Sequence, residues 1–165
     1  MGRQMLKDRF KVTPAVHLIL IREGDVLLLR RFNTGYEDGN YSVPAGHLDG
    51  CESASAAMAR EVREETGIII DTQNLRVVHV MHRNISRDSL APEERVDFFL
   101  SADRWDGKPL IMEPTKCDEL AWYPIDNLPG NVVPYVQAAL TAYLSGQYYS
   151  EFGWQSAYAG AAAAS

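Results

Sequence analysis

The segment from Glu52 to Thr66 constrains the fold of this 165-residue chain more than any other. Its apolar residues recur near the 3.6-residue period of an α-helix: Ala54, Ala57, Met58 and Val62. Cys51 or Ser53 is suited to cap the start of that helix. Gly67 stands where a helix commonly ends in the left-handed conformation. The sequence therefore predicts one amphipathic helix over residues 52–66.

Three carboxylates share one face of this predicted helix, because Glu61, Glu64 and Glu65 stand at positions i, i+3 and i+4. One interpretation is a solvated charged face, with Arg60 and Arg63 interleaved. The other is a site for a hard divalent cation such as Mg²⁺, which prefers oxygen ligands. The Pro-Ala-Gly loop at 44–46 favours the second, since such a loop can present backbone groups to a phosphate or a metal.

The rest of the chain reads as strands with one further long helix. Strands are predicted at 13–21, 26–30, 41–43, 75–82, 95–102 and 119–123, with a hairpin turn at 23–25 and loops at 32–40 and 83–94. One helical turn is predicted at 125–128 and a helix at 133–144. This order predicts the α/β class, an α/β/α sandwich around a mixed β-sheet, over residues 12–145. Residues 1–11 are expected to be a lead-in and 146–165 an aromatic and Ala-rich tail.

Composition narrows the function classes. At 46% hydrophobic and 23% charged residues, the chain is typical of a soluble globular protein. Its net charge of −6 argues against nonspecific nucleic-acid binding, so we expect no nucleic-acid partner. Cys51 and Cys117 fit neither a zinc spacing nor a disulfide framework. The absence of an apolar targeting or membrane-spanning run leads us to expect a cytoplasmic protein without a membrane partner.

The spacing around the helix resembles a complete Nudix box, the signature of the Nudix hydrolases. Gly46 is followed after five residues by Glu52, and after seven more by Arg60-Glu61-Val62-Arg63-Glu64-Glu65-Thr66-Gly67-Ile68. The resemblance extends over about residues 12–145 and implies a Nudix fold. It also implies a hydrolase that cleaves a nucleoside diphosphate linked to another group, with a metal-activated water attacking phosphorus.

The resemblance also implies roles for single residues. Glu61, Glu64 and Glu65 would bind Mg²⁺ or Mn²⁺, and Glu64 or Glu65 would orient or deprotonate the water. Arg60 and Glu52 would form a salt bridge that fixes the loop, which Gly46 shapes, while Gly67 ends the helix. The carbonyl of Ala45 would reach the metal. Many family members have glycine at position 45, and Ala45 carries a cost only if the backbone there needs a positive φ.

A second motif resembles the MutT-type nucleoside-triphosphate diphosphatases, in particular the branch acting on thiopurine and oxidised nucleotides. It consists of Glu113-Pro114-Thr115-Lys116-Cys117, then Trp122-Tyr123-Pro124 and Leu128-Pro129, and the loop GHLDGCE at 46–52 agrees with it. It implies hydrolysis of a nucleoside triphosphate to the monophosphate and pyrophosphate. Two alternatives stay open: another nucleoside diphosphate derivative such as a nucleotide sugar, and a nucleotide-sensing module without catalysis.

Residues outside the box are candidates for the substrate. Arg30 and His47 are candidates for phosphate, Asn131 and Tyr135 for the border of a base pocket, and Glu113 and Glu119 for an extra carboxylate near the metal. Each has an ordinary alternative as a surface or packing residue. We expect Trp122, His17 and Cys117 to be core residues. Nudix enzymes are commonly homodimers, and the aromatic tail is suited to cover a neighbouring subunit or its own pocket.

Overall fold

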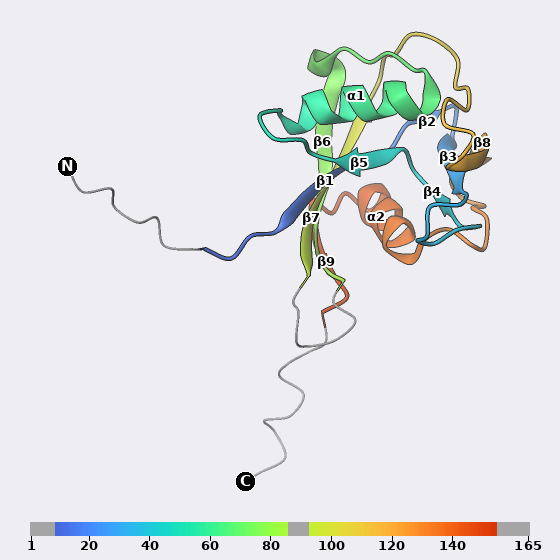
Figure 1. The fold of residues 1–165 in the computed structure, drawn as a ribbon. Helices are drawn as coiled ribbons and strands as arrows, with labels where there is room; N and C mark the ends of the chain where they lie inside the picture. The colour runs from blue at the N-terminus through green and yellow to red at the C-terminus, as the bar shows by residue number, and fades with distance from the viewer. Residues whose placement is uncertain (1–8, 86–92, 155–165) are drawn as a thin grey trace.

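The computed structural model describes residues 9–85 and 93–154, and a five-stranded mixed sheet organises them (Figure 1). Its strand order is β5-β1-β7-β6-β9. The strands are β1 (Thr13–Leu18), β5 (Ala45–His47), β6 (Leu75–Asn84), β7 (Glu94–Ala102) and β9 (Tyr149–Phe152). β1 runs parallel to β7 and β6 parallel to β9, while the pairs β1–β5 and β6–β7 are antiparallel.

A second sheet stands beside the first and contains β2 (Ile21–Arg22), β3 (Asp25–Arg31), β4 (Tyr41–Ser42) and β8 (Cys117–Pro124). β2 and β3 form the predicted hairpin. Glu23 and Gly24 both have positive φ angles, of 53° and 88°, which is typical of the two-residue turns that match strand twist. β8 pairs with β3, so the middle part of the second motif, Cys117–Pro124, is fixed on this sheet.

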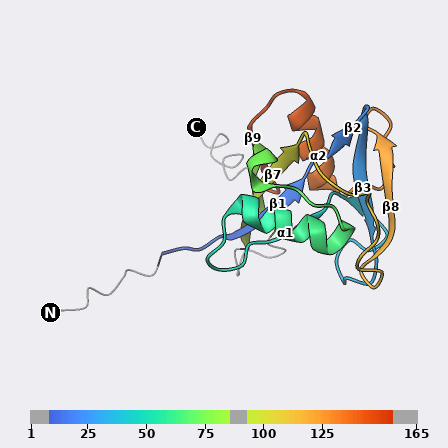
Figure 2. The ribbon, with the colours of Figure 1, turned by 90° about the horizontal axis from the view of Figure 1, so that it is seen from above.

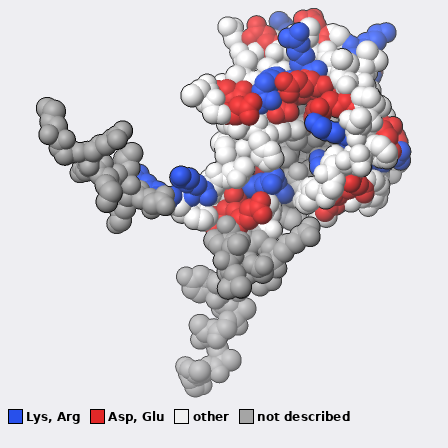
Figure 3. Space-filling view, viewed as in Figure 1, with Lys and Arg blue, Asp and Glu red and all other residues white. Residues whose placement is uncertain are grey.

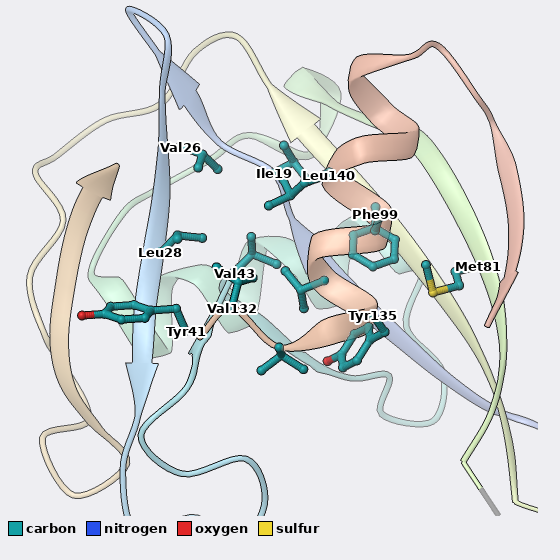
Figure 4. Close-up of a cluster of buried hydrophobic side chains, with 13 residues drawn as sticks. Ile19, Val26, Leu28, Tyr41, Val43, Met81, Phe99, Val132, Tyr135 and Leu140 are labelled. Carbon is teal, nitrogen blue, oxygen red and sulfur yellow. The ribbon is translucent and has the colours of Figure 1, made fainter. Parts of the chain in front are cut away.

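Two helices cover opposite faces of the five-stranded sheet, with α1 (Ala54–Thr66) on one side and α2 (Pro134–Leu144) on the other (Figures 1 and 2). Successive residues of β7 show how the sheet serves both layers. Phe99 packs into the cluster that contains Leu140 of α2 (Figure 4). Leu100 packs into the cluster that contains Met58 of α1, on the other face of the sheet. The predicted α/β sandwich is therefore confirmed.

The ends of α1 follow from local chemistry. Ser53, not Cys51, is the N-cap, and its hydroxyl accepts a hydrogen bond from the amide of Ala56 at 3.2 Å. Gly67 closes the helix with a φ of 71°, and its N–H donates to the carbonyl of Arg63. The three carboxylates are thus placed at the C-terminal end of a capped helix.

The structure differs from the sequence expectations in several places. The single strand expected at 13–21 is divided into β1 of the first sheet and β2 of the second. Residues 125–128 form a turn, closed by the amide of Asn127 on the carbonyl of Pro124 at 3.0 Å, rather than a helical turn. β5 was expected as loop. β9 lies in the segment expected as tail, and its pairing with β6 extends the sheet beyond residue 145. Residues 1–8, 86–92 and 155–165, including Tyr158 and much of the predicted 83–94 loop, lie outside the described residues.

A short 3-10 helix, η1 (Thr72–Asn74), leads from α1 into β6. Within the described part of the chain, neither helix has the length and apolar character needed to cross a membrane.

Candidate active site

The C-terminal half of α1 is joined to β5 through its carboxylates. An oxygen of Glu65 accepts a hydrogen bond from the backbone N–H of Ala45 at 2.9 Å. The carboxylate of Glu61 lies directly against Gly46, where a Cβ atom would overlap with it. Ala45 is not among the described residues with a positive φ, so the alanine carries no backbone strain. The box glycine is therefore needed for close approach rather than for an unusual φ.

Arg60 ties the loop, β5 and the helix together. Its guanidinium lies 2.7 Å from Glu52, 2.7 Å from Glu61 and 3.3 Å from Glu64. It also donates to the carbonyl of His47 at 3.2 Å. Glu52 also accepts a hydrogen bond from the backbone N–H of Asp49 at 2.6 Å. This carboxylate therefore binds both the loop and Arg60. The geometry agrees with the salt bridge expected between Arg60 and Glu52.

Burial makes two of the α1 carboxylates harder to ionise. Burial, reinforced by the charges of Glu61 and Glu113, raises the pKa of Glu65 to about 8, although the N–H of Ala45 opposes the shift. Burial also raises the pKa of Glu61 above its ordinary range, although Arg60 opposes it. Figure 3 shows acidic side chains gathered over α1 and a hollow below them. A cation at this place would favour the ionised carboxylates.

The donor set fits a hard divalent cation, because carboxylate and backbone oxygens are the ligands that Mg²⁺ prefers. Yet across residues 9–85 and 93–154, no three His, Cys, Asp or Glu side chains converge as a ready metal site. Arg60 and the Ala45 amide occupy carboxylate oxygens instead. Glu64 is the most exposed of the three, with 54% of its side chain accessible.

The two candidates for an extra carboxylate lie in different surroundings. The charge of Glu113, in the loop before β8, acts on both Glu61 and Glu65. Glu113 forms an ion pair with the ammonium group of Lys116 at 2.8 Å. Glu119 instead accepts a hydrogen bond from Tyr123 and lies 3.4 Å from Arg30. Glu113 is therefore the better placed of the two for the carboxylate cluster.

The arginine expected at the phosphates is engaged elsewhere. Arg30 makes two hydrogen bonds to Asp118, at 2.7 and 3.1 Å. The next residue, Arg31, donates to the carbonyl of Tyr36 at 2.7 Å, and its charge slightly opposes the raised pKa of Glu65. The sequence alone left this undecided, because adjacent strand residues point to opposite faces and both are arginines. The strand pairing also shifts register between them.

The remaining substrate candidates divide by exposure. His47 lies at the end of β5 and its side chain is accessible to solvent. Partial desolvation of the imidazole, and then the charge of Arg95, lower its pKa. Asn131 donates to the carbonyl of Gly39 at 2.7 Å and so holds the 32–40 loop. Tyr135 is buried in the core. Asn131 and Tyr135 thus contact other parts of the fold, and of the three candidates only His47 borders the α1–β5 junction.

The three residues expected in the core lie there or against it. Trp122 packs against the cluster on the α1 side, with the guanidinium of Arg22 4.4 Å from its ring centroid. Cys117 is buried, and burial raises the pKa of its thiol. Both cysteines are free, as expected. His17 is buried in β1.

This fold and this junction define a protein of the Nudix class. The family model described as the NUDIX domain matches residues 11–143, and the chain belongs to that family. The predicted family is therefore confirmed.

Named relatives agree with this assignment. The NAD-capped RNA hydrolase NudC of Shigella dysenteriae serotype 1 is 33% identical over 124 residues, 75% of this chain and 44% of that protein. NudC of Salmonella typhi is 30% identical over 125 residues, again 44% of its length. This chain thus spans less than half of the relatives that it matches.

Solved structures give the same fold. The MutT NUDIX hydrolase from Burkholderia pseudomallei superposes with a TM-score of 0.70 at 26% identity, covering 80% of this chain and 98% of that one. The MutT protein from Bacillus halodurans gives a TM-score of 0.67 at 21% identity, covering 85% and 88% of the two chains, and supports the fold alone.

Proposed function

We propose that this chain hydrolyses a nucleoside triphosphate, normal or chemically modified, to the monophosphate and pyrophosphate, with Mg²⁺ or Mn²⁺ as cofactor. The observation that carries this proposal is the junction of α1 and β5. There, Glu65 accepts a hydrogen bond from the backbone of Ala45 and Glu61 lies against Gly46, and both of these carboxylates have raised pKa values. Glu64 stands on the same helix face.

Glu61, Glu64 and Glu65 would hold the cation, together with the carbonyl of Ala45. A bound divalent cation neutralises phosphate charge and lowers the pKa of water. Glu64 is our choice for the residue that orients or deprotonates the attacking water, because it is the most exposed of the three. Glu65 is the alternative, since its raised pKa suits a proton acceptor.

The chain's own cations would bind the phosphates. Arg31 is fixed by the carbonyl of Tyr36 and by the hydroxyl of Thr34, at 2.7 and 3.0 Å. The charge of Lys116 interacts with Glu65 and Glu61. Because the charges of Arg31 and Lys116 act on these carboxylates, both residues suit the terminal phosphates of a substrate that the metal would bridge to the helix. This answers how a chain with a net charge of −6 handles an anionic substrate.

The test is a panel of nucleotides with Mg²⁺, scored for pyrophosphate against orthophosphate, on the parent and on Glu64→Gln. We expect pyrophosphate from at least one triphosphate. We expect Glu64→Gln to lose at least about 100-fold in kcat while keeping its unfolding midpoint. Failure of every triphosphate to yield pyrophosphate would sink the proposal. A fully active Glu64→Gln would refute the assigned role of the carboxylates.

A second candidate is hydrolysis of a dinucleotide or other nucleoside diphosphate derivative. The relatives called NAD-capped RNA hydrolases favour it, so the panel includes NAD, a nucleotide sugar and a NAD-capped RNA. Activity on the capped RNA would overturn the expectation that the chain has no nucleic-acid partner. A module that senses nucleotides without catalysis is disfavoured, because all three glutamates of the box are present. The homodimer that the family resemblance suggests is a further proposal, and light scattering that gives the mass of a single chain would contradict it.

A further inference from the structure

The chain between β7 and β8 crosses the C-terminal end of α1 (Figure 1). We call residues 106–113 of this connection the strap. At its start, the N–H of Asp106 donates to the carbonyl of Ile69 at 2.9 Å, and the N–H of Ile69 donates back to Asp106 at 3.0 Å. At its end, the carbonyl of Glu113 accepts a hydrogen bond from the N–H of Lys116 at 2.9 Å, in the turn before β8. Backbone hydrogen bonds therefore fix both ends of the strap.

The middle of the strap caps the helix. The last carbonyl groups of an α-helix have no partner within the helix itself. Met112 donates its N–H to the carbonyl of Glu65 at 3.1 Å, and Leu110 donates its N–H to the carbonyl of Thr66 at 2.9 Å. Glu65 and Thr66 are the last two residues of α1. The end of the helix is thus completed by a segment that lies far away in the chain.

The side chains of the strap do not account for its course. Leu110, Ile111 and Met112 are apolar, yet they are 63%, 37% and 53% exposed. The side chain of Met112 only covers Gly67, with its sulfur 3.4 Å from the position that an added Cβ would take. In the described part of the chain, the N–H of Ile111 takes part in no hydrogen bond. The contact with α1 therefore depends chiefly on the two alternate backbone N–H groups.

One of these two hydrogen bonds reaches a residue of the proposed reaction centre. The carboxylate of Glu65 accepts the N–H of Ala45 in β5, while its carbonyl accepts the N–H of Met112. β5 and the strap thus hold Glu65 by its side chain and by its backbone. The residue after Met112 is Glu113, whose charge acts on both Glu61 and Glu65. A shift of the strap would therefore move the backbone of Glu65 and the charge of Glu113 together.

We propose that Met112 is a positioning residue of the reaction centre, which acts through its backbone N–H by fixing Glu65 at the end of α1. The inference rests on the proposed function for the role of Glu65. It adds a contact from outside residues 46–68 to those that determine the geometry of the carboxylates. Because the contact comes from the backbone, the N–H of residue 112 matters more than its side chain.

The first experiment needs no turnover. Amide hydrogen exchange of the parent, followed by NMR, compares three neighbouring residues whose side chains are all exposed. We expect the N–H groups of Leu110 and Met112 to exchange at least about 100-fold more slowly than that of Ile111. Titration with Mg²⁺ alone should also move the amide resonance of Met112 more than that of Ile111, because the acceptor of Met112 belongs to Glu65.

The second experiment removes the hydrogen bond. Met112→Pro has no N–H to donate. Ile111→Pro is the matched control, because it places the same ring one residue earlier, where no hydrogen bond among the described residues is lost. Met112→Leu keeps the N–H and an apolar side chain. Each protein is assayed for kcat and KM with a triphosphate that the parent hydrolyses, and for the rise of its unfolding midpoint with Mg²⁺.

We expect Met112→Pro to lose about tenfold in kcat while KM changes by no more than about twofold, because the bond positions a carboxylate rather than the substrate. It should also need about fivefold more Mg²⁺ for the same rise of the unfolding midpoint. Ile111→Pro should match the parent. Met112→Leu should recover most of the rate that Met112→Pro loses.

The inference is overturned if the N–H of Met112 exchanges as fast as that of Ile111, since the bond would then be absent in solution. It is equally overturned if Met112→Pro loses only thermal stability, or if Ile111→Pro loses as much kcat as Met112→Pro. Where Met112→Pro does not fold, a Met112 resonance that Mg²⁺ leaves unmoved in the parent overturns it. If no triphosphate is hydrolysed while the exchange and Mg²⁺ results hold, the proposed function fails and the positioning contact stands.

Discussion

Because Gly46 has no Cβ atom, β5 can approach α1 closely at this position. A Cβ there would overlap with the carboxylate of Glu61. Gly46→Ala must therefore displace Glu61 or the strand, and a shift of about 1 Å at a reactive centre can cost about 100-fold in kcat. Gly50→Ala is the matched control, since a Cβ at 50 meets nothing within 4 Å. Rates and unfolding midpoints of both variants test this. Equal activity of the two would contradict it.

The carboxylate of Glu52 links stability to pH. Arg60, and then the amide of Asp49, lower the pKa of Glu52 below its ordinary value of 4.5. A lowered folded pKa contributes stability above the unfolded value, and that stability is lost as the pH falls through the folded pKa. We expect Glu52→Gln to be less stable than the parent at neutral pH, and the gap to close below about pH 4. Urea unfolding across this range measures it, and a constant gap would contradict the assignment.

Among the elements, those with a strong local signal were predictable from the sequence. α1 was predictable because its apolar period, its N-cap residue and its terminal glycine all indicate the same helix. The hairpin turn at Glu23 was predictable because its signal lies in neighbouring residues of the sequence. β5 was missed because it has three residues, including Gly46, and exists only through pairing with β1. β9 was missed because its pairing partner, β6, lies far away in the chain. The pairing of Arg30 with Asp118 was not predictable for the same reason, since it depends on the pairing of β3 with β8.

The C-terminal strand β9 pairs with β6, and Gly153 follows directly after its last residue. A Cβ at 153 would overlap with the carbonyl of Asn84 in β6, and the φ there is +79°. Gly146 has a similar φ of +73° but open space around it. Gly146→Ala should cost only backbone strain, about 1 kcal/mol. Gly153→Ala should lower the free energy of unfolding by more than this, because the added Cβ also displaces the carbonyl of Asn84. Amide hydrogen exchange along β6 should then be faster. Equal unfolding free energies of the two variants would show that the close approach is unimportant.

At the scale of the whole molecule, the acidic face of α1 should make stability respond to Mg²⁺. A ligand that binds only the folded chain stabilises it, by about 1.4 kcal/mol at a concentration ten times its Kd. For a chain of this length that is a rise of a few degrees in the unfolding midpoint, roughly 3–6 °C. Potassium chloride of equal ionic strength separates binding from screening of the net charge of −6. Glu64→Gln should lose most of the rise, while Glu151→Gln, on β9 outside the carboxylate cluster, should keep it. A rise that potassium reproduces, or that Glu64→Gln retains, would mean that the face of Glu61, Glu64 and Glu65 is only a solvated surface.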